Sequence, residues 1–230
     1  MKILVIIISH DFSKRWCNNI AVLHKFMQQI TPNVYYAGIC SSNYDEFHNY
    51  EDIISFQYKI INPKRQFSKI CDFITEYKNE LDYDWYIKIR PEVLLFENIP
   101  FHQLSNCAIN ARARYYIGPR QIPYGSSIGG IGDNFNMTHY YRYDTYEHDI
   151  GLDDHLFIFH KNVINHNAFD TCISPDTEPE NEVMQSTIWK SRNIGFNVIG
   201  INMVMQKYNY YSGHIYIPKT RKSKPKMIFA

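Results

Sequence analysis

The sequence lacks the features that mark several specialised protein classes. Its five cysteines are odd in number and widely spaced, with no C-x-x-C pair, which argues against a disulfide framework and a zinc knuckle. No apolar run is long enough to span a bilayer, and the N-terminal stretch MKILVIIISH has no small-residue cleavage site. We therefore expect a cytoplasmic protein with reduced thiols and no transmembrane segment.

The sequence also has little net charge. The formal value is +1, so no overall field points to nucleic acid as a partner. Positive charge gathers only near the C-terminus, where Lys219 to Lys226 is rich in Lys and Arg. We interpret residues 216–230 as a basic tail and predict a single domain over residues 1–215, a length that can bury its own core.

Aromatic residues are abundant, at 16% of the chain with 19 Tyr. A tyrosine has an apolar ring and a polar tip, which suits a half-wet cleft that stacks rings and binds hydroxyls. Tyrosine is also a good strand former. Both interpretations stay open at this point.

Hydrophobic patterning predicts strands that alternate with helices. Ile3–Ile8 is a continuous apolar run, typical of a parallel strand covered on both faces. The other expected strands are 34–39, 53–61, 85–89, 108–117, 156–164 and 196–205, and the expected helices are 17–30, 67–81 and 179–193. This order predicts an α/β fold with a central, mostly parallel mixed sheet flanked by helices on both faces. No glycine fingerprint follows the first strand, which disfavours a dinucleotide site.

The expected strand Trp85–Ile89 runs into Arg90-Pro91-Glu92, and an apolar run resumes at Val93. Proline ends the strand because it has no N–H to donate. Open α/β sheets bind ligands at the carboxyl ends of their strands, so this break is a candidate site. An arginine there can pair with a diphosphate, and a carboxylate can hold a divalent metal. Either group would stabilise a departing nucleoside diphosphate.

The stretch Asp84 to Val93 resembles the GT-A glycosyltransferases, whose hallmark hhhh-D-x-D-hhh stands where this chain has YIKI-RPE-VLL. It is similar to small glycosyltransferase domains of large algal (chlorella) DNA viruses, over residues 1 to about 215. The resemblance implies one GT-A (Rossmann-like) domain, in the host cytoplasm if viral. It also implies transfer of a hexose or pentose from a nucleoside diphosphate sugar, such as a UDP-sugar, to a glycan or glycoprotein hydroxyl.

The resemblance further implies a divalent metal, Mn²⁺ or Mg²⁺. Arg90 stands at the first acidic position of the family pattern, which leaves Glu92 as the expected metal ligand. His214 lies where some relatives supply a late metal ligand. The donor is expected to bind where the first strand ends and beside the start of the second helix, at Ser9, His10, Asp11, Lys69 and Arg90. A solvated basic face is the alternative for Lys69.

Two acidic clusters are candidates for the general base that deprotonates the acceptor. Asp153 and Asp154 resemble the family's DDQ-f-i stretch, with His155 expected at a sugar hydroxyl, and Gly132–Phe135 is a rival for this role. Glu180 and Glu182 open the predicted helix 179–193, where inverting GT-A enzymes carry the base. A polar strand cap and favourable charge at a helix N-terminus are the respective structural alternatives.

Two other functions stay open. Another nucleotide-using α/β transferase, such as a nucleotidyltransferase, would share the fold, whereas a methyltransferase should show a glycine-rich loop after the first strand. A non-catalytic carbohydrate-binding module would use the tyrosines but would need neither Arg90-Pro91-Glu92 nor the acidic clusters. The literal D-x-D at Asp82–Asp84 precedes a strand, and we interpret it as a polar turn.

Overall fold

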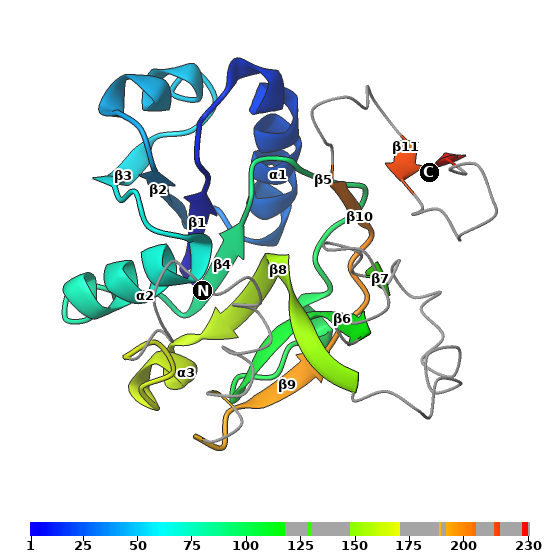
Figure 1. Ribbon diagram of the computed structural model, residues 1–230. Helices are drawn as coiled ribbons and strands as arrows, with labels where there is room; N and C mark the ends of the chain where they lie inside the picture. The colour runs from blue at the N-terminus through cyan, green and yellow to red at the C-terminus, as the bar shows by residue number, and fades with distance from the viewer. Residues whose placement is uncertain are drawn as a thin grey trace.

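The computed structural model describes the backbone of residues 1–117, 128–129, 148–170, 189, 192–205, 214–216 and 227–229, and the side chains of 1–112, 155–170, 189 and 192–204. Figure 1 shows the elements in space. Their order is β1 Ile3–Ile8, η1 Lys14–Trp16, α1 Cys17–Ile30, β2 Val34–Cys40, η2 Tyr44–Asn49, β3 Phe56–Ile61, α2 Gln66–Tyr77, β4 Trp85–Ile89, β5 Val93–Leu95, η3 Phe101–Gln103, β6 Ala108–Ile117, β7 Ile128–Gly129, β8 His148–His160, α3 Lys161–Asn165, β9 Gly195–Val198, β10 Met203–Met205, β11 His214–Tyr216 and β12 Met227–Phe229.

The main sheet has the strand order β3-β2-β1-β4-β8-β6-β7, with β9 on β6. Strands β3, β2, β1 and β4 are parallel, whereas β8 runs antiparallel to both β4 and β6. The chain winds outward from β1 to β3 and then returns through α2 to β4, on the other side of β1. This reversal is a topological switch point between β1 and β4. It confirms the predicted α/β sheet, with β1 and β4 as interior strands.

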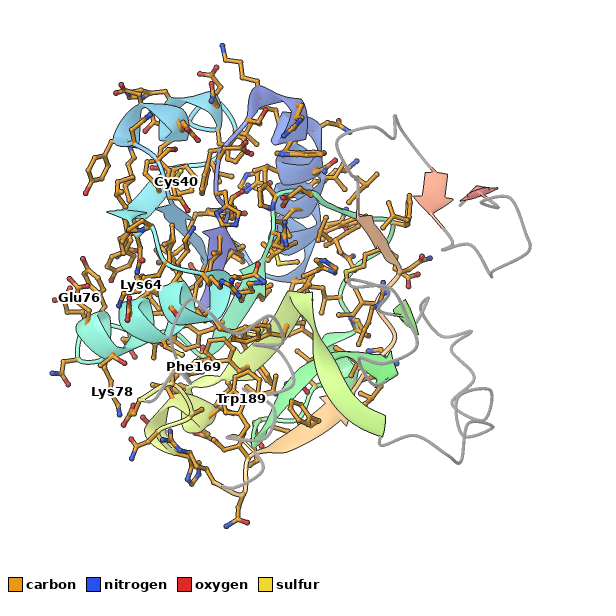
Figure 2. All side chains as sticks on the ribbon, viewed as in Figure 1. Cys40, Lys64, Glu76, Lys78, Phe169 and Trp189 are labelled. Atoms are coloured by element: carbon orange, nitrogen blue, oxygen red, sulfur yellow. The ribbon has the colours of Figure 1, made fainter. Side chains whose placement is uncertain are left out.

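Alternate residues of β1 enter two different hydrophobic cores, as the period of a strand requires. Ile3, Val5 and Ile7 pack with residues of α1, and Leu4, Ile6 and Ile8 pack with residues of α2. The two helices cover opposite faces of the sheet, as predicted (Figure 1). Phe169 and Trp189 extend the α2 face, with ring centroids 5.9 Å apart (Figure 2).

Two element boundaries differ from the sequence prediction. Helix α2 ends at Tyr77 rather than at residue 81, because the amides of Glu80 and Leu81 both bond to the Tyr77 carbonyl in a turn. Leu81 still packs against the core, so the apolar period continues beyond the helix. Strand β3 begins at Phe56 rather than at Ile53, because the Ile53 amide bonds to the Tyr50 carbonyl in a turn.

The sequence predicts a single strand in each of two apolar runs, but the structure divides each run between two elements. The run 156–164 joins the end of β8 to α3, whose Val163 and Ile164 are buried from a helix. The run 196–205 divides into β9, which pairs with β6, and β10, which pairs with β5 in a separate sheet. Most of the predicted helix 179–193 lies outside the described residues. The boundary at residue 215 stays a prediction.

No helix in the described ranges has both the length and the apolar character needed to cross a membrane.

Candidate functional site

The carboxyl ends of β1, β2 and β4 meet at one edge of the sheet, which we call the switch-point edge. Ser9 follows β1, Ser41 follows β2 and Arg90 follows β4. The backbone ladder continues beyond the first two strands, because Ser9 N–H donates to the Ile39 carbonyl at 3.1 Å and Ser41 N–H donates to the His10 carbonyl at 3.3 Å. The fold therefore brings Ser9, His10 and Asp11 beside the break at Arg90, and the binding of a donor to these residues stays a prediction.

The loop after β1 is held by side chains of η2 and the residue after it. The Phe12 amide donates to Glu46 Oε2 at 2.6 Å, Asn49 Nδ2 donates to the Phe12 carbonyl at 2.8 Å, and the Tyr50 hydroxyl donates to the Ser13 carbonyl at 3.2 Å. Burial opposes the charge of Glu46, but hydrogen bonds from Ser42 and Phe12 keep its pKa below the ordinary value. These bonds fix the position of His10 and Asp11 without a glycine-rich turn.

Lys69 lies directly beneath the switch-point edge, in the first turn of α2, with a side chain only 1% exposed. Its Nζ donates to the Ser9 carbonyl and to Ser41 Oγ, each at 2.6 Å. Burial lowers the pKa of Lys69 to about 8, with Cys40 opposing this shift and the Arg90 charge reinforcing it. Among the side chains that the structure describes, no carboxylate forms an ion pair with Lys69. Figure 2 labels Cys40 at the end of β2.

Arg90 and Glu92 form an ion pair across the break after β4. Arg90 Nη2 lies 2.9 Å from Glu92 Oε1, and Nε lies 3.3 Å from Oε2. Burial alone would raise the pKa of Glu92, but the Arg90 hydrogen bond and charge hold it below the ordinary value, so Glu92 is a carboxylate at neutral pH. Asn19 of α1 donates to the Pro91 carbonyl at 3.0 Å and anchors the turn.

A bulge in β8 faces the same edge. Ala111 of β6 pairs with Phe157 and Ala113 pairs with Leu152, so residues 153–156 stand opposite Arg112 alone. The Arg90 amide donates to the His155 carbonyl at 3.0 Å, which places the bulge at the carboxyl end of β4. Asp153 and Asp154 therefore lie within a strand, not before one as the sequence suggests. Bulges commonly re-aim side chains next to functional sites.

The carboxylates described at this edge do not fit a divalent cation as they stand. Both oxygens of Glu92 accept from Arg90, and Asp11 Oδ2 lies 3.9 Å from Arg15 Nη2. Within the ranges searched, no group of three or more His, Cys, Asp and Glu side chains has the arrangement of a metal site. The side chain of His214 lies outside the described residues, as do Glu180, Glu182 and Gly132–Phe135, so the roles expected of them stay predictions.

The literal D-x-D at Asp82–Asp84 lies at the opposite end of the sheet, before β4. Asp82 Oδ2 lies 2.9 Å from Lys2 Nζ, and Asp84 accepts from the Lys2 amide at 2.8 Å and from Lys161 Nζ at 3.2 Å. A surface hollow of about 320 Å³ near Asn98 also lies away from the switch-point edge, because Asn98 bonds to Gln29 at the far end of α1.

Sequence reasoning missed the residues that hold the site together, namely Ser41, Glu46 and Asn49. A usable signal exists for Ser41. It follows the second predicted strand as Ser9 follows the first, and the carboxyl ends of parallel strands share an edge. No such signal marks Glu46 or Asn49, because their partners are backbone groups more than thirty residues away along the chain.

No family model and no curated protein matches the chain. Among solved structures, CMP:2-keto-3-deoxy-manno-octonic acid synthetase complexed with CTP matches with a TM-score of 0.46 and 8% identity, over 88% of this chain and 93% of that one. A glycosyltransferase involved in the glycosylation of the major capsid of PBCV-1 matches with a TM-score of 0.45 and 7% identity, over 87% of this chain and 82% of that one. At these values the likenesses carry no argument about activity.

Proposed function

We propose that the protein is a glycosyltransferase that binds a nucleoside diphosphate sugar, such as a UDP-sugar, at the switch-point edge. The sugar would pass to a hydroxyl of a glycan or glycoprotein. The observation that carries this proposal is the presence of two cationic side chains, Arg90 and the buried Lys69, at the edge where α/β sheets bind ligands. Arg90 is held in place by its ion pair with Glu92, and Lys69 is held by the Ser9 carbonyl and Ser41 Oγ, with no ion-pair partner among the described side chains.

Arg90 is the group best suited to the diphosphate. Glu92 orients the guanidinium through Nη2 and Nε, and a guanidinium carries five N–H donors in a planar fork. A guanidinium matches the geometry of phosphate oxygens, and its charge stabilises the diphosphate as the sugar bond breaks. The Lys69 ammonium is buried and cannot contact a ligand directly. Its positive charge would act on the diphosphate only through its electrostatic field.

A carboxylate of the β8 bulge, Asp153 or Asp154, is proposed as the general base, with Glu180 and Glu182 as the other candidates. The base takes the proton of the acceptor hydroxyl as its oxygen bonds to the anomeric carbon of the sugar. The bond from that carbon to the diphosphate oxygen breaks at the same time, and the diphosphate leaves with the electron pair. A single displacement of this kind inverts the anomeric configuration.

A divalent metal, when bound, would supply positive charge to the leaving diphosphate. Of the expected ligands, Glu92 is engaged with Arg90, which leaves Arg90 as the cation at this position. Turnover that is indifferent to EDTA would agree with Arg90 as the main cation. Turnover that requires Mn²⁺ or Mg²⁺ would instead return Glu92 to the role of metal ligand.

Calorimetric titration with nucleoside diphosphates tests the proposal, with transfer followed by release of the diphosphate from the nucleotide sugar. We expect Arg90→Ala to weaken binding about 10- to 100-fold, the effect of losing a charge-assisted hydrogen bond. Arg192→Ala is the matched control, because Arg192 bonds to the Asn167 carbonyl beyond α3, far from this edge. Absence of binding to every nucleoside diphosphate, with and without metal, would refute the proposal. Release of pyrophosphate from a nucleoside triphosphate would indicate a nucleotidyltransferase instead.

A further inference from the structure

Three side chains form a hydrogen-bonded chain from the core to the switch-point edge. Lys69 Nζ donates to Ser41 Oγ at 2.6 Å, and Ser41 Oγ lies 3.1 Å from His10 Nδ1. The members come from α2, from the end of β2 and from the end of β1. Lys69 is buried, Ser41 is half-buried and His10 is exposed, so only His10 can meet a ligand directly.

The direction of these hydrogen bonds follows from which groups carry protons. An ammonium can only donate, so Ser41 Oγ accepts from Lys69 and keeps its single proton for another partner. The acceptor available in the described residues is His10 Nδ1. If Nδ1 carried the proton instead, the Ser41 hydroxyl would accept twice and its own proton would have no described acceptor. The second bond of Lys69, to the Ser9 carbonyl, fixes the ammonium in place.

We propose that Ser41 is a positioning residue that holds His10 as the Nε2–H tautomer, so that a neutral imidazole presents an N–H donor to an oxygen atom of the bound nucleotide. This inference rests on the proposed function for the identity of the ligand. The tautomer itself does not depend on it. A fixed donor of this kind selects for an acceptor oxygen and adds no charge beside those of Arg90 and Lys69.

The surroundings of His10 favour the neutral ring. Burial lowers the pKa of His10, and the charges of Lys69 and Arg90 lower it further, whereas Glu92 and Asp11 act in the opposite direction. The ring therefore stays uncharged at pH 7. Hydrogen bonds in a chain polarise one another, so the Lys69 ammonium strengthens the donor that His10 offers outward.

The first experiment measures the tautomer in the free full-length protein by ¹⁵N NMR of the imidazole at pH 7.5, with the His10 signal assigned through His10→Gln. We expect the proton on Nε2 in the wild type and in Ser41→Thr, which keeps the hydroxyl. Ser41→Ala should show a mixture of tautomers. A proton on Nδ1 in the wild type, or an unchanged tautomer in a folded Ser41→Ala protein, would overturn the inference.

The second experiment compares the affinities of UDP, uridine and pyrophosphate for the wild type, His10→Gln and His10→Phe. The amide of Gln replaces the lost N–H donor, so we expect binding within about threefold of wild type, whereas His10→Phe should lose about tenfold. Loss with uridine identifies a nucleobase or ribose oxygen, and loss with pyrophosphate identifies a phosphate oxygen. His102→Phe, in the exposed η3 segment, is the matched control and should change nothing.

The two proposals fail in different ways. If His10→Phe binds all three probes as tightly as wild type, the role of His10 is overturned and the proposed function stands. If the wild type binds none of the three probes, the proposed function and the ligand part of this inference both fall, and the NMR result still decides whether Ser41 sets the tautomer.

Discussion

The two ends of the central sheet carry similar residues in opposite environments. At the amino end, Asp82 and Asp84 pair with Lys2 and Lys161 on the surface, where side chains are 36% to 83% exposed. At the switch-point edge, Glu92 is 8% exposed and Lys69 is 1% exposed. Exposed pairs are screened by water and contribute little, whereas covered charges interact strongly and are costly to leave unpaired. The two ends therefore differ in how deeply their charged side chains are buried, and the D-x-D pattern lies at the exposed end.

The largest expected difference between the two ends is in the transfer rate after a carboxylate is changed to an amide. Asp153→Asn or Asp154→Asn should lower the transfer rate about 10²- to 10⁴-fold with nucleotide affinity unchanged, because a general base acts on the acceptor proton. Asp82→Asn, at the amino end, should leave the rate at the wild-type value. Steady-state kinetics with calorimetry measures both quantities. If Asp153, Asp154, Glu180 and Glu182 can all be changed to amides at full rate, the assignment of the base is wrong.

The two ends should also differ in how much stability is lost when a paired carboxylate is removed, and the Arg90–Glu92 pair provides the buried case. Glu92→Gln should lower the free energy of unfolding by about 2 kcal/mol, because it removes the negative charge that Glu92 supplies to a partly covered guanidinium. Asp84→Asn removes a carboxylate that is also paired, with Lys161 and the Lys2 amide, but lies on the surface, and its effect should be distinctly smaller. Urea denaturation of the three proteins at pH 7 measures the difference. Equal losses would mean that burial does not distinguish the two ends.

Lys69 gives the switch-point edge a stability that depends on pH between about 8 and 10.5. Its pKa falls from 10.5 to about 8 on folding, so between these values the unfolded chain binds more protons than the native state. Stability should therefore rise with pH in this window, by about 1.5 kcal/mol between pH 8 and pH 9.5. The rise should be absent in Lys69→Met. Denaturant titrations of both proteins at several pH values provide the measurement, and parallel curves would contradict it.

The same Lys69 pKa predicts how nucleotide binding depends on pH. A diphosphate favours the charged ammonium, so affinity should be highest below pH 8 and should fall as the pH rises through about 8. Binding near pH 8 should take up part of a proton per site, which calorimetry in buffers of different ionisation enthalpy detects. An affinity independent of pH between 7 and 9 would place the phosphates away from Lys69.

The smallest effect is expected for the exposed pair of Lys2 and Asp82. Lys2→Ala should leave the thermal midpoint unchanged within error, because both side chains stay solvated whether or not they pair. Differential scanning calorimetry at low and high salt checks this. A clear loss of stability would show that the amino end is more constrained than its exposure suggests.

Much of the fold could be predicted from the sequence because the signal is local. The unbroken apolar run Ile3–Ile8 and the strand Trp85–Ile89 with its proline break are readable without tertiary information. The prediction fails where apolar residues serve different elements in succession, as at 156–164 and 196–205. Hydrophobicity reports burial, and a run that leaves one strand for a helix or another sheet can be buried throughout.

The sequence by itself determined which residue types lie at the carboxyl ends of β1 and β4. Only the tertiary structure decided which of them meet. The pairing of β4 with β8 brought the bulge at Asp153–His155 to Arg90, and the packing of α2 on the sheet buried Lys69 against Ser9 and Ser41. These contacts join residues far apart in the chain. Their burial also sets the pKa of each group, since desolvation depends on everything packed around it.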